Sequence, residues 1–164
     1  MMTLLSLLAC LNIQAGTAEV SFADADKFRD IESGEMHKAA FRANVLKGFN
    51  KHFNRLAKKL PESQKLKVKI TDLDLAGSTF HSGLNRTRVV SEVYYPKIEF
   101  TYKLLASDMS VLVEGEEKLK DSNFMSRAGS IRMRQDALRY EKRMLDKWFK
   151  SFIKQQSSKV AETK

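Results

Sequence analysis

Apolar side chains in the first half of the chain recur with the period of a helix. From Asn44 to Leu60 they stand every three or four positions, at Val45, Phe49, Phe53, Leu56 and Leu60. At about 100° per residue this spacing gathers them in one stripe, so the pattern predicts an amphipathic helix that Pro61 ends. Basic residues follow the same spacing out of step with the stripe, and we expect them on the opposite face: Lys47, Lys51, Arg55 and Lys58.

A second helical pattern runs from about Ala137 to Lys154, with Asp136 in the position of a cap. Its apolar stripe consists of Leu138, Met144, Leu145, Trp148, Phe149 and Phe152. We expect Trp148 to be a core anchor rather than part of a ligand site. Glu141 falls on the same apolar face, where an unpaired charge is costly. It therefore needs a partner, either an arginine of residues 127–139 or a lysine of a facing strand.

Between the two helices the period changes to two, which is typical of strands. The first such run alternates Leu66, Val68 and Ile70 with Lys65, Lys67 and Lys69. Its apolar positions change phase at Asp72, which predicts a β-bulge. Ile98–Leu104 and Val111–Leu119 are separated by a short turn and are expected to pair as a hairpin. Glu19–Ala23 predicts a short first strand, and the weakly patterned Gly77–Tyr95 predicts a long loop in which residues 86–91 could form a strand.

Together these elements predict an α+β domain. Its mainly antiparallel sheet has three to four strands, with one helix from the N-terminal half and a C-terminal helix packed on one face. A chain of 164 residues with 43% hydrophobic content can bury such a core without disulfides or metals. We expect the domain to span residues 19–154, with a polar tail at residues 155–164.

The first residues indicate export. No charge precedes Glu19, and Leu4–Leu11 is an apolar run too short to span a membrane but suited to a signal-peptide core. Small residues at Gly16 and Ala18 predict cleavage before Glu19, which makes residues 1–18 a signal peptide and the protein periplasmic or otherwise exported. The usual positive residues before the core are missing, and the alternative is a buried N-terminal helix.

Cys10 is the chain's one cysteine and lies inside this apolar run. Leu7–Cys10 loosely resembles the lipobox of bacterial lipoproteins, so the alternative localisation is a membrane anchor through Cys10. Either fate leaves the domain without a disulfide, a thiol nucleophile or a zinc–thiolate site. No transmembrane span is expected in the mature chain.

The formal net charge of +9 is concentrated in residues 38–69 and 127–154. The candidate anion-binding residues are Lys47, Lys51, Arg55, Lys58, Lys65, Lys67, Lys69, Arg127, Arg132 and Arg134. In an exported protein they indicate anionic lipid, lipopolysaccharide or an acidic envelope protein as partner, and nucleic acid is not expected. The alternative is a solvated face without a partner.

The segment TDLDLAG at Thr71–Gly77 spaces Asp72 and Asp74 like the first ligands of a calcium loop. However, Ala76 has no side-chain oxygen, and Gly83 stands where the loop requires glutamate. The pattern therefore favours a bulged strand end whose aspartates face solvent or bind backbone amides.

No catalytic residue, metal site or cofactor is predicted. The three histidines, His37, His52 and His81, do not share a metal-ligand spacing, and no nucleophile, phosphate or dinucleotide motif occurs. An enzyme would have to bring distant carboxylates together at one pocket, and the candidates for that cluster are Asp72, Asp74, Glu117 and Glu141.

Three blocks carry a resemblance to a known family: Thr71–Gly77, Gly115–Asp121 and Leu138–Phe149. They resemble an exported bacterial family catalogued as domain of unknown function three-zero-one-six, over a range from about Glu19 to Phe152. The resemblance implies export and one compact domain, but no activity, cofactor or catalytic residue. Members usually follow the second block with Asp-Met or similar and a tyrosine, whereas residues 122–124 are Ser-Asn-Phe here.

The leading hypothesis is a non-enzymatic cell-envelope module that binds an anionic surface or an acidic partner. One alternative is a carboxylate-based hydrolase or metal-dependent enzyme, which requires the four carboxylates to converge. The other is a structural accessory subunit, which a contiguous exposed apolar patch would indicate.

Overall fold

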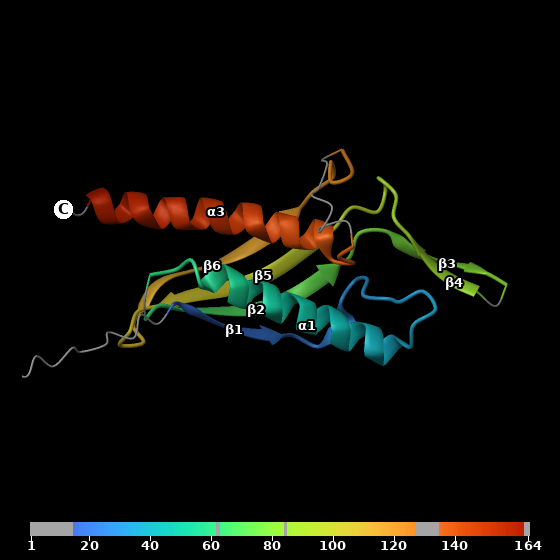
Figure 1. Cartoon of the computed structure of the whole chain (residues 1–164), viewed down its shortest axis with the longest axis horizontal. Coiled ribbons are helices and arrows are strands. Elements are labelled where there is room, and N and C mark those ends of the chain that lie inside the picture. The colour runs from blue at the N-terminus through green and yellow to red at the C-terminus, as the bar shows by residue number, and fades with distance from the viewer. Residues whose placement is uncertain (1–14, 62, 84, 127–134, 163–164) are drawn as a thin grey trace, which may run out of the picture.

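A four-stranded sheet with two helices on one face forms the body of the protein (Figure 1). The computed structural model describes residues 15–61, 63–83, 85–126 and 135–162. The sheet has the order β1-β2-β5-β6, with β1 at Thr17–Phe22, β2 at Lys65–Asp74, β5 at Lys97–Leu105 and β6 at Val111–Lys120. The helices are α1 (Lys38–Ala57) and α3 (Arg139–Glu162). The predicted α+β class is confirmed.

The sheet is mixed. β2 pairs antiparallel with β5, and β5 pairs antiparallel with β6 in the predicted hairpin. β1 runs parallel to β2. A parallel neighbour needs a crossover connection, and α1 supplies it between β1 and β2.

The predicted bulge lies in β2, where the pairing with β5 shifts between Ile70 and Asp72. Before it, Leu66, Val68 and Ile70 point toward the helices, and after it Leu73 does so again. The shift thus keeps apolar side chains in the core on both sides of the bulge. It also leaves Asp72 and Asp74 on the outer face, which is the face of the sheet turned away from both helices.

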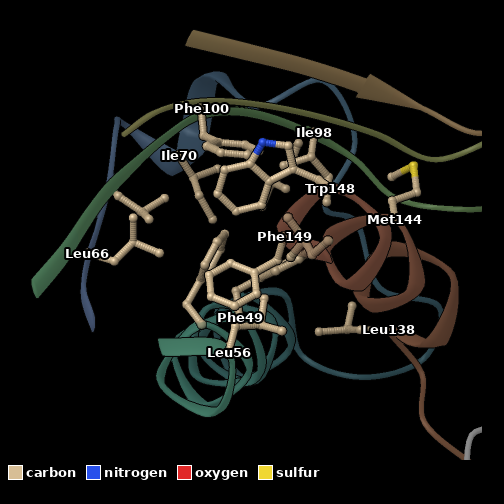
Figure 2. Close-up of a cluster of buried hydrophobic side chains, with 14 of the residues drawn as sticks. Phe49, Leu56, Leu66, Ile70, Ile98, Phe100, Leu138, Met144, Trp148 and Phe149 are labelled. Atoms are coloured by element: carbon tan, nitrogen blue, oxygen red, sulfur yellow. The ribbon is translucent and has the colours of Figure 1, made fainter. Parts of the chain in front are cut away.

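The core lies between the sheet and the two helices, as Figure 2 shows. The Trp148 ring meets Phe100 edge-on at 4.9 Å between ring centroids and stacks on Phe152 at 5.4 Å. Phe49 and Phe53 of α1 are fully buried beside them. Each such side chain contributes about 1.5–3 kcal/mol by burial, so these aromatic contacts hold both helices to the sheet. The prediction that Trp148 is a core anchor agrees with this packing.

Three local features differ from the sequence-based expectation. β3 (Ser78–Ser82) and β4 (Asn85–Val89) pair as a projecting hairpin within the expected loop, and β4 overlaps the possible strand at residues 86–91. α1 starts at Lys38, before the predicted stripe and inside residues 35–43, a segment whose sequence allows a helix, and a short 3-10 turn, η1 (Ala25–Lys27), precedes it. α3 continues to Glu162, through most of the expected tail, and runs past the end of the sheet (Figure 1).

The first strand overlaps the predicted signal-peptide cleavage position. β1 begins at Thr17, so cleavage before Glu19 would remove the first two residues of that strand. Neither helix of the described ranges has the apolar length that crossing a bilayer requires.

Candidate anion-binding groove

α1 and α3 lie on the same side of the sheet and leave a groove between them. It consists of two hollows of about 230 and 490 Å³, which share Arg55 and Asp146 in their walls. Gly48 of α1 faces Leu138, and a Cβ at Gly48 would lie 2.7 Å from Leu138 Cδ1. This glycine therefore sets how closely the start of α3 approaches α1. We call this feature the inter-helix groove.

The walls of the inter-helix groove are strongly basic. They contain two acids, Asp136 and Asp146, and six basic side chains: Lys51, Arg55, Lys59, Arg139, Lys142 and Lys150. Phe149 and Ile153 of α3 form the apolar part of the lining. The groove therefore combines positive charge with an apolar surface.

The two acids of the groove are already bound. Asp136 accepts a hydrogen bond from Lys142 Nζ at 2.6 Å, and its other oxygen accepts the Leu138 N–H at 2.9 Å, as predicted for a cap. Asp146 lies 3.2 Å from Arg55 Nη2. By contrast, Lys51, Lys59 and Lys150 are exposed and form no ion pair with any other described residue.

Asp146 also approaches a buried histidine. His52 Nε2 lies 3.2 Å from Asp146 Oδ1, and Arg55 Nη2 lies 3.1 Å from His52 Nδ1. Because arginine only donates, Nδ1 accepts and Nε2 carries the hydrogen that faces the aspartate. Burial alone would raise the pKa of Asp146, but its contacts with His52 and Arg55 and the charge of Lys59 lower it below its ordinary value. The carboxylate therefore stays ionised at neutral pH and holds His52 and Arg55 in place.

The structure separates the residues that the sequence nominated for anion binding. Lys51 and Arg55 line the groove, while Lys47 and Lys58 are exposed on α1 outside its lining. Lys65, Lys67 and Lys69 alternate with buried residues of β2 and so lie on the outer face, across the sheet from the helices. Arg127, Arg132 and Arg134 fall outside the described residues. The nominated residues thus do not form one surface.

The outer face carries basic side chains that are largely paired. Glu19 of β1 lies 2.9 Å from Lys65 and 3.8 Å from Lys67. Lys103 lies 2.7 Å from Glu114. Exposed pairs of this kind contribute about 0–1 kcal/mol each, so this face is a solvated surface of balanced charge.

The four candidate carboxylates do not converge. Asp72 and Asp74 lie on the outer face, 2.9 Å from Arg29 Nε and 2.7 Å from Lys97 Nζ. Glu117 lies on the helix side of β6, and Glu141 is buried in α3. Within the described ranges no three acidic, histidine or cysteine side chains are grouped so that they could hold a metal. Basic side chains neutralise both aspartates, which favours the bulged strand end over a calcium loop.

Glu141 is buried as predicted, with 1% of its surface exposed, while Arg127, Arg132 and Arg134, three of its predicted partners, fall outside the described residues. Its Oε1 accepts the backbone N–H of Ala76 at 2.8 Å, and no arginine or lysine of the described ranges forms an ion pair with it. Burial raises the pKa of Glu141 above its ordinary value, more than the Ala76 amide and the charges of Arg88 and Arg139 lower it. The group is a buried acid that the Ala76 amide contacts directly.

The Ala76 amide is itself fixed by Arg88 of β4. The guanidinium donates to the carbonyls of Leu75 at 2.7 Å, Ala76 at 3.1 Å and Gly77 at 3.0 Å, and it binds Asp30 Oδ2 at 3.0 Å. Gly77 has a φ of +87°, and a Cβ there would lie 2.4 Å from the carbonyl oxygen of Val89. The glycine of the TDLDLAG segment is therefore required by the turn after β2.

Sequence reasoning missed four of the six basic residues of the groove: Lys59, Arg139, Lys142 and Lys150. Lys59 follows the stripe residues of α1 directly, and the other three lie on α3. Each lies beside the predicted apolar stripe of its helix, and that position is the signal that could have found them. These residues come together only because α1 and α3 pack side by side, and the sequence pattern of one helix does not predict that packing.

Taken together, the fold and the groove define a two-layer α+β domain with a basic groove between its helices. The chain belongs to the family described as "Protein of unknown function (DUF3016)", whose family model matches residues 16–151. This confirms the resemblance. The match extends from β1 into α3 and includes all the groove residues of α3 except Ile153. Comparison with curated proteins and with solved structures finds no match.

Proposed function

We propose that this protein is a non-enzymatic, exported cell-envelope module whose inter-helix groove binds the phosphate-bearing headgroup of an anionic lipid. The observation that carries the proposal is a set of three groove lysines that form no ion pair with a described residue: Lys51, Lys59 and Lys150. Ammonium groups held around a concave surface favour an anion with several acceptor oxygens.

The chemistry of the groove favours a lipid over a simple anion. Phe149 and Ile153 lie in the same hollow as Lys59 and Lys150, so that part of the groove offers an apolar surface beside its charges. Arg55 is held by Asp146, keeps most of its side chain exposed and lines both hollows of the groove. The volume of the groove falls in the range of small-molecule sites, about 300–1,000 Å³.

Export supports the choice of partner. The apolar run Leu4–Leu11 and the small residues before Glu19 have the pattern of a signal peptide. An exported chain meets anionic phospholipid and lipopolysaccharide at the membranes of the envelope. Basic residues near such surfaces contribute about 1 kcal/mol each to binding.

The enzyme alternative lacks a comparable observation, because its four carboxylates lie on different sides of the sheet. The accessory-subunit alternative rests on exposed apolar side chains of the β3–β4 region, where Phe80 and Tyr94 contact each other at 6.1 Å between ring centroids. Neither alternative is supported by a concave site with basic side chains, so we rank both alternatives below lipid binding.

Vesicle sedimentation at low and high salt tests the proposal with two triple variants of equal charge change. The groove variant is Lys51→Glu, Lys59→Glu and Lys150→Glu. The matched control, on the outer face, is Lys67→Glu, Lys69→Glu and Lys103→Glu. We expect wild type to bind anionic but not neutral vesicles, and more weakly as salt rises.

The groove variant should lose on the order of a hundredfold in affinity, and the control variant only a few fold. Equal losses in the two variants would show attraction by net charge without a site. No binding by wild type at either salt would refute lipid binding and leave an acidic protein as the candidate partner.

A further inference from the structure

The outer edge of β6 is unpaired within the described part of the chain. β6 is the last strand in the order β1-β2-β5-β6 and is 10 residues long. Its backbone N–H and C=O groups on the side away from β5 have no neighbouring strand. Such an edge is a template for another strand, and proteins either protect it or use it.

Charges along this edge change sign from one end to the other. The outer-face positions of β6 alternate with partly buried ones and carry Glu114 and Glu116 first, then Lys118 and Lys120. If two copies of β6 pair antiparallel with Glu117 opposite Glu117, Glu114 meets Lys120 of the second copy and Glu116 meets Lys118. Symmetry repeats both contacts, so each of the four charges meets its opposite.

Among the outer-face positions of β6, this register sets no like charges opposite each other, unlike the next register on either side. On the helix side it sets Glu117 against Glu117. A two-fold pairing must keep outer-face residues opposite outer-face residues, so the register can change only in steps of two. The next register in one direction sets Glu116 against Glu116, and the next in the other direction sets Lys118 against Lys118. Like charges directly opposite are destabilising, whereas opposite charges contribute about 0.2–1 kcal/mol per pair. β1, the other edge strand, carries one charge, Glu19, and offers no such pattern.

The surroundings of β6 fit the same register. On the helix side Gly115 would stand opposite Leu119 of the second copy, and the two Glu117 carboxylates would meet at the axis. Glu117 and Lys147 of α3 both line one hollow of about 400 Å³ on this side of the sheet.

Exposed apolar side chains lie at both ends of the edge. Met109, Val111 and Leu112 lie at its start, and Met125 lies beyond its end. Antiparallel pairing brings the start of one β6 toward the end of the other, where these side chains would cover one another.

We infer that β6 is a homodimer interface: two copies pair antiparallel through this edge, with Glu117 at the two-fold axis, to form one continuous eight-stranded sheet. Both pairs of helices then lie on the same side of the joined sheet. The inference rests on β6 alone and is independent of the lipid-binding proposal.

Sedimentation velocity on the full chain tests the interface with two charge variants. Glu114→Lys with Glu116→Lys makes the edge wholly basic, and Lys118→Glu with Lys120→Glu makes it wholly acidic. Wild type should be a dimer, and each variant alone should self-associate on the order of a hundredfold more weakly. An equimolar mixture of the two variants should recover dimers, because every cross-strand pair is again of opposite sign.

A monomeric wild type, or variants that dimerise as well as wild type, would refute the interface. Because all four side chains are exposed, circular dichroism should show both variants folded. Failure of the mixture to dimerise after both variants lose self-association would refute this register.

Disulfide trapping gives an independent test of the register, in a chain whose Cys10 is replaced by serine. Glu117→Cys should cross-link two copies on oxidation, since directly opposed residues lie within disulfide reach. Glu114→Cys should not, because its twin would be six positions away, at roughly 20 Å. Cross-linking of Glu114→Cys but not of Glu117→Cys would refute the proposed pairing.

Discussion

The two sides of the sheet differ in how many of their charged side chains form ion pairs. On the outer face lysines lie within reach of glutamates, as Lys65 does at 2.9 Å from Glu19, and the aspartates at the bulge bind Arg29 and Lys97. On the helix side Lys51, Lys59 and Lys150 form no ion pair with a described residue, and Glu141 is buried against a backbone amide. The number of charges along the sequence therefore does not locate a site. Their pairing in the fold marks the inter-helix groove as the candidate.

The largest expected difference between the two sides is in stability. Trp148→Ala should lower the free energy of unfolding by about 3–5 kcal/mol, because it removes the ring that contacts Phe100, Tyr102 and Phe152. Thr101→Ala, on the exposed outer face of β5, should change it by less than about 0.5 kcal/mol. Urea unfolding measures both. A similar loss in the two variants would mean that the core is not where the structure places it.

An intermediate effect is expected from the buried acid. A carboxyl whose folded-state pKa is raised contributes most below its ordinary pKa of 4.5, and that stability is lost as pH rises through the folded-state value. Glu141→Gln keeps an oxygen for the Ala76 N–H and removes the charge.

We therefore expect the Gln variant to match wild type near pH 4 and to exceed it at pH 7 by about 1 kcal/mol or more. Unfolding free energies at the two pH values test this. A variant that falls further below wild type at pH 7 than at pH 4 would show that the fold stabilises the charged form.

The smallest effect is expected for the ion pairs of the outer face. Arg29 lies 2.9 Å from both Asp72 and Glu99 and is half exposed. Arg29→Ala should cost no more than about 1 kcal/mol at low salt and less at high salt, because solvent screens exposed pairs. Thermal unfolding at two salt concentrations measures it. A loss well above 2 kcal/mol that salt does not change would show that these pairs hold the fold.

Sequence periodicity predicted most of the architecture, because burial on one face leaves a repeating signal. The stripe of Phe49 and Phe53 located α1, and the phase change at Asp72 located the bulge. β3 was missed, and β4 was anticipated only as a possible strand at residues 86–91, because both strands, STFHS and NRTRV, are mostly polar and exposed and burial imposes no pattern on them.

The candidate site was predicted only in part, for a physical reason. Lys51 and Arg55 stood out on one helix, but Lys150 joins them through the packing of α3 beside α1. The partner of Glu141 is a backbone amide, which every residue carries and no sequence pattern reveals.

Amine-reactive labelling read by mass spectrometry tests the central claim most directly, because it compares the two sides of the sheet within one molecule. In the presence of anionic phospholipid, we predict slower labelling of the groove lysines Lys51, Lys59 and Lys150. The outer-face lysines Lys67 and Lys69 should label at an unchanged rate, and neutral phospholipid should protect neither set. Equal protection of the two sets by anionic lipid, or protection of neither, would contradict a lipid site in the groove.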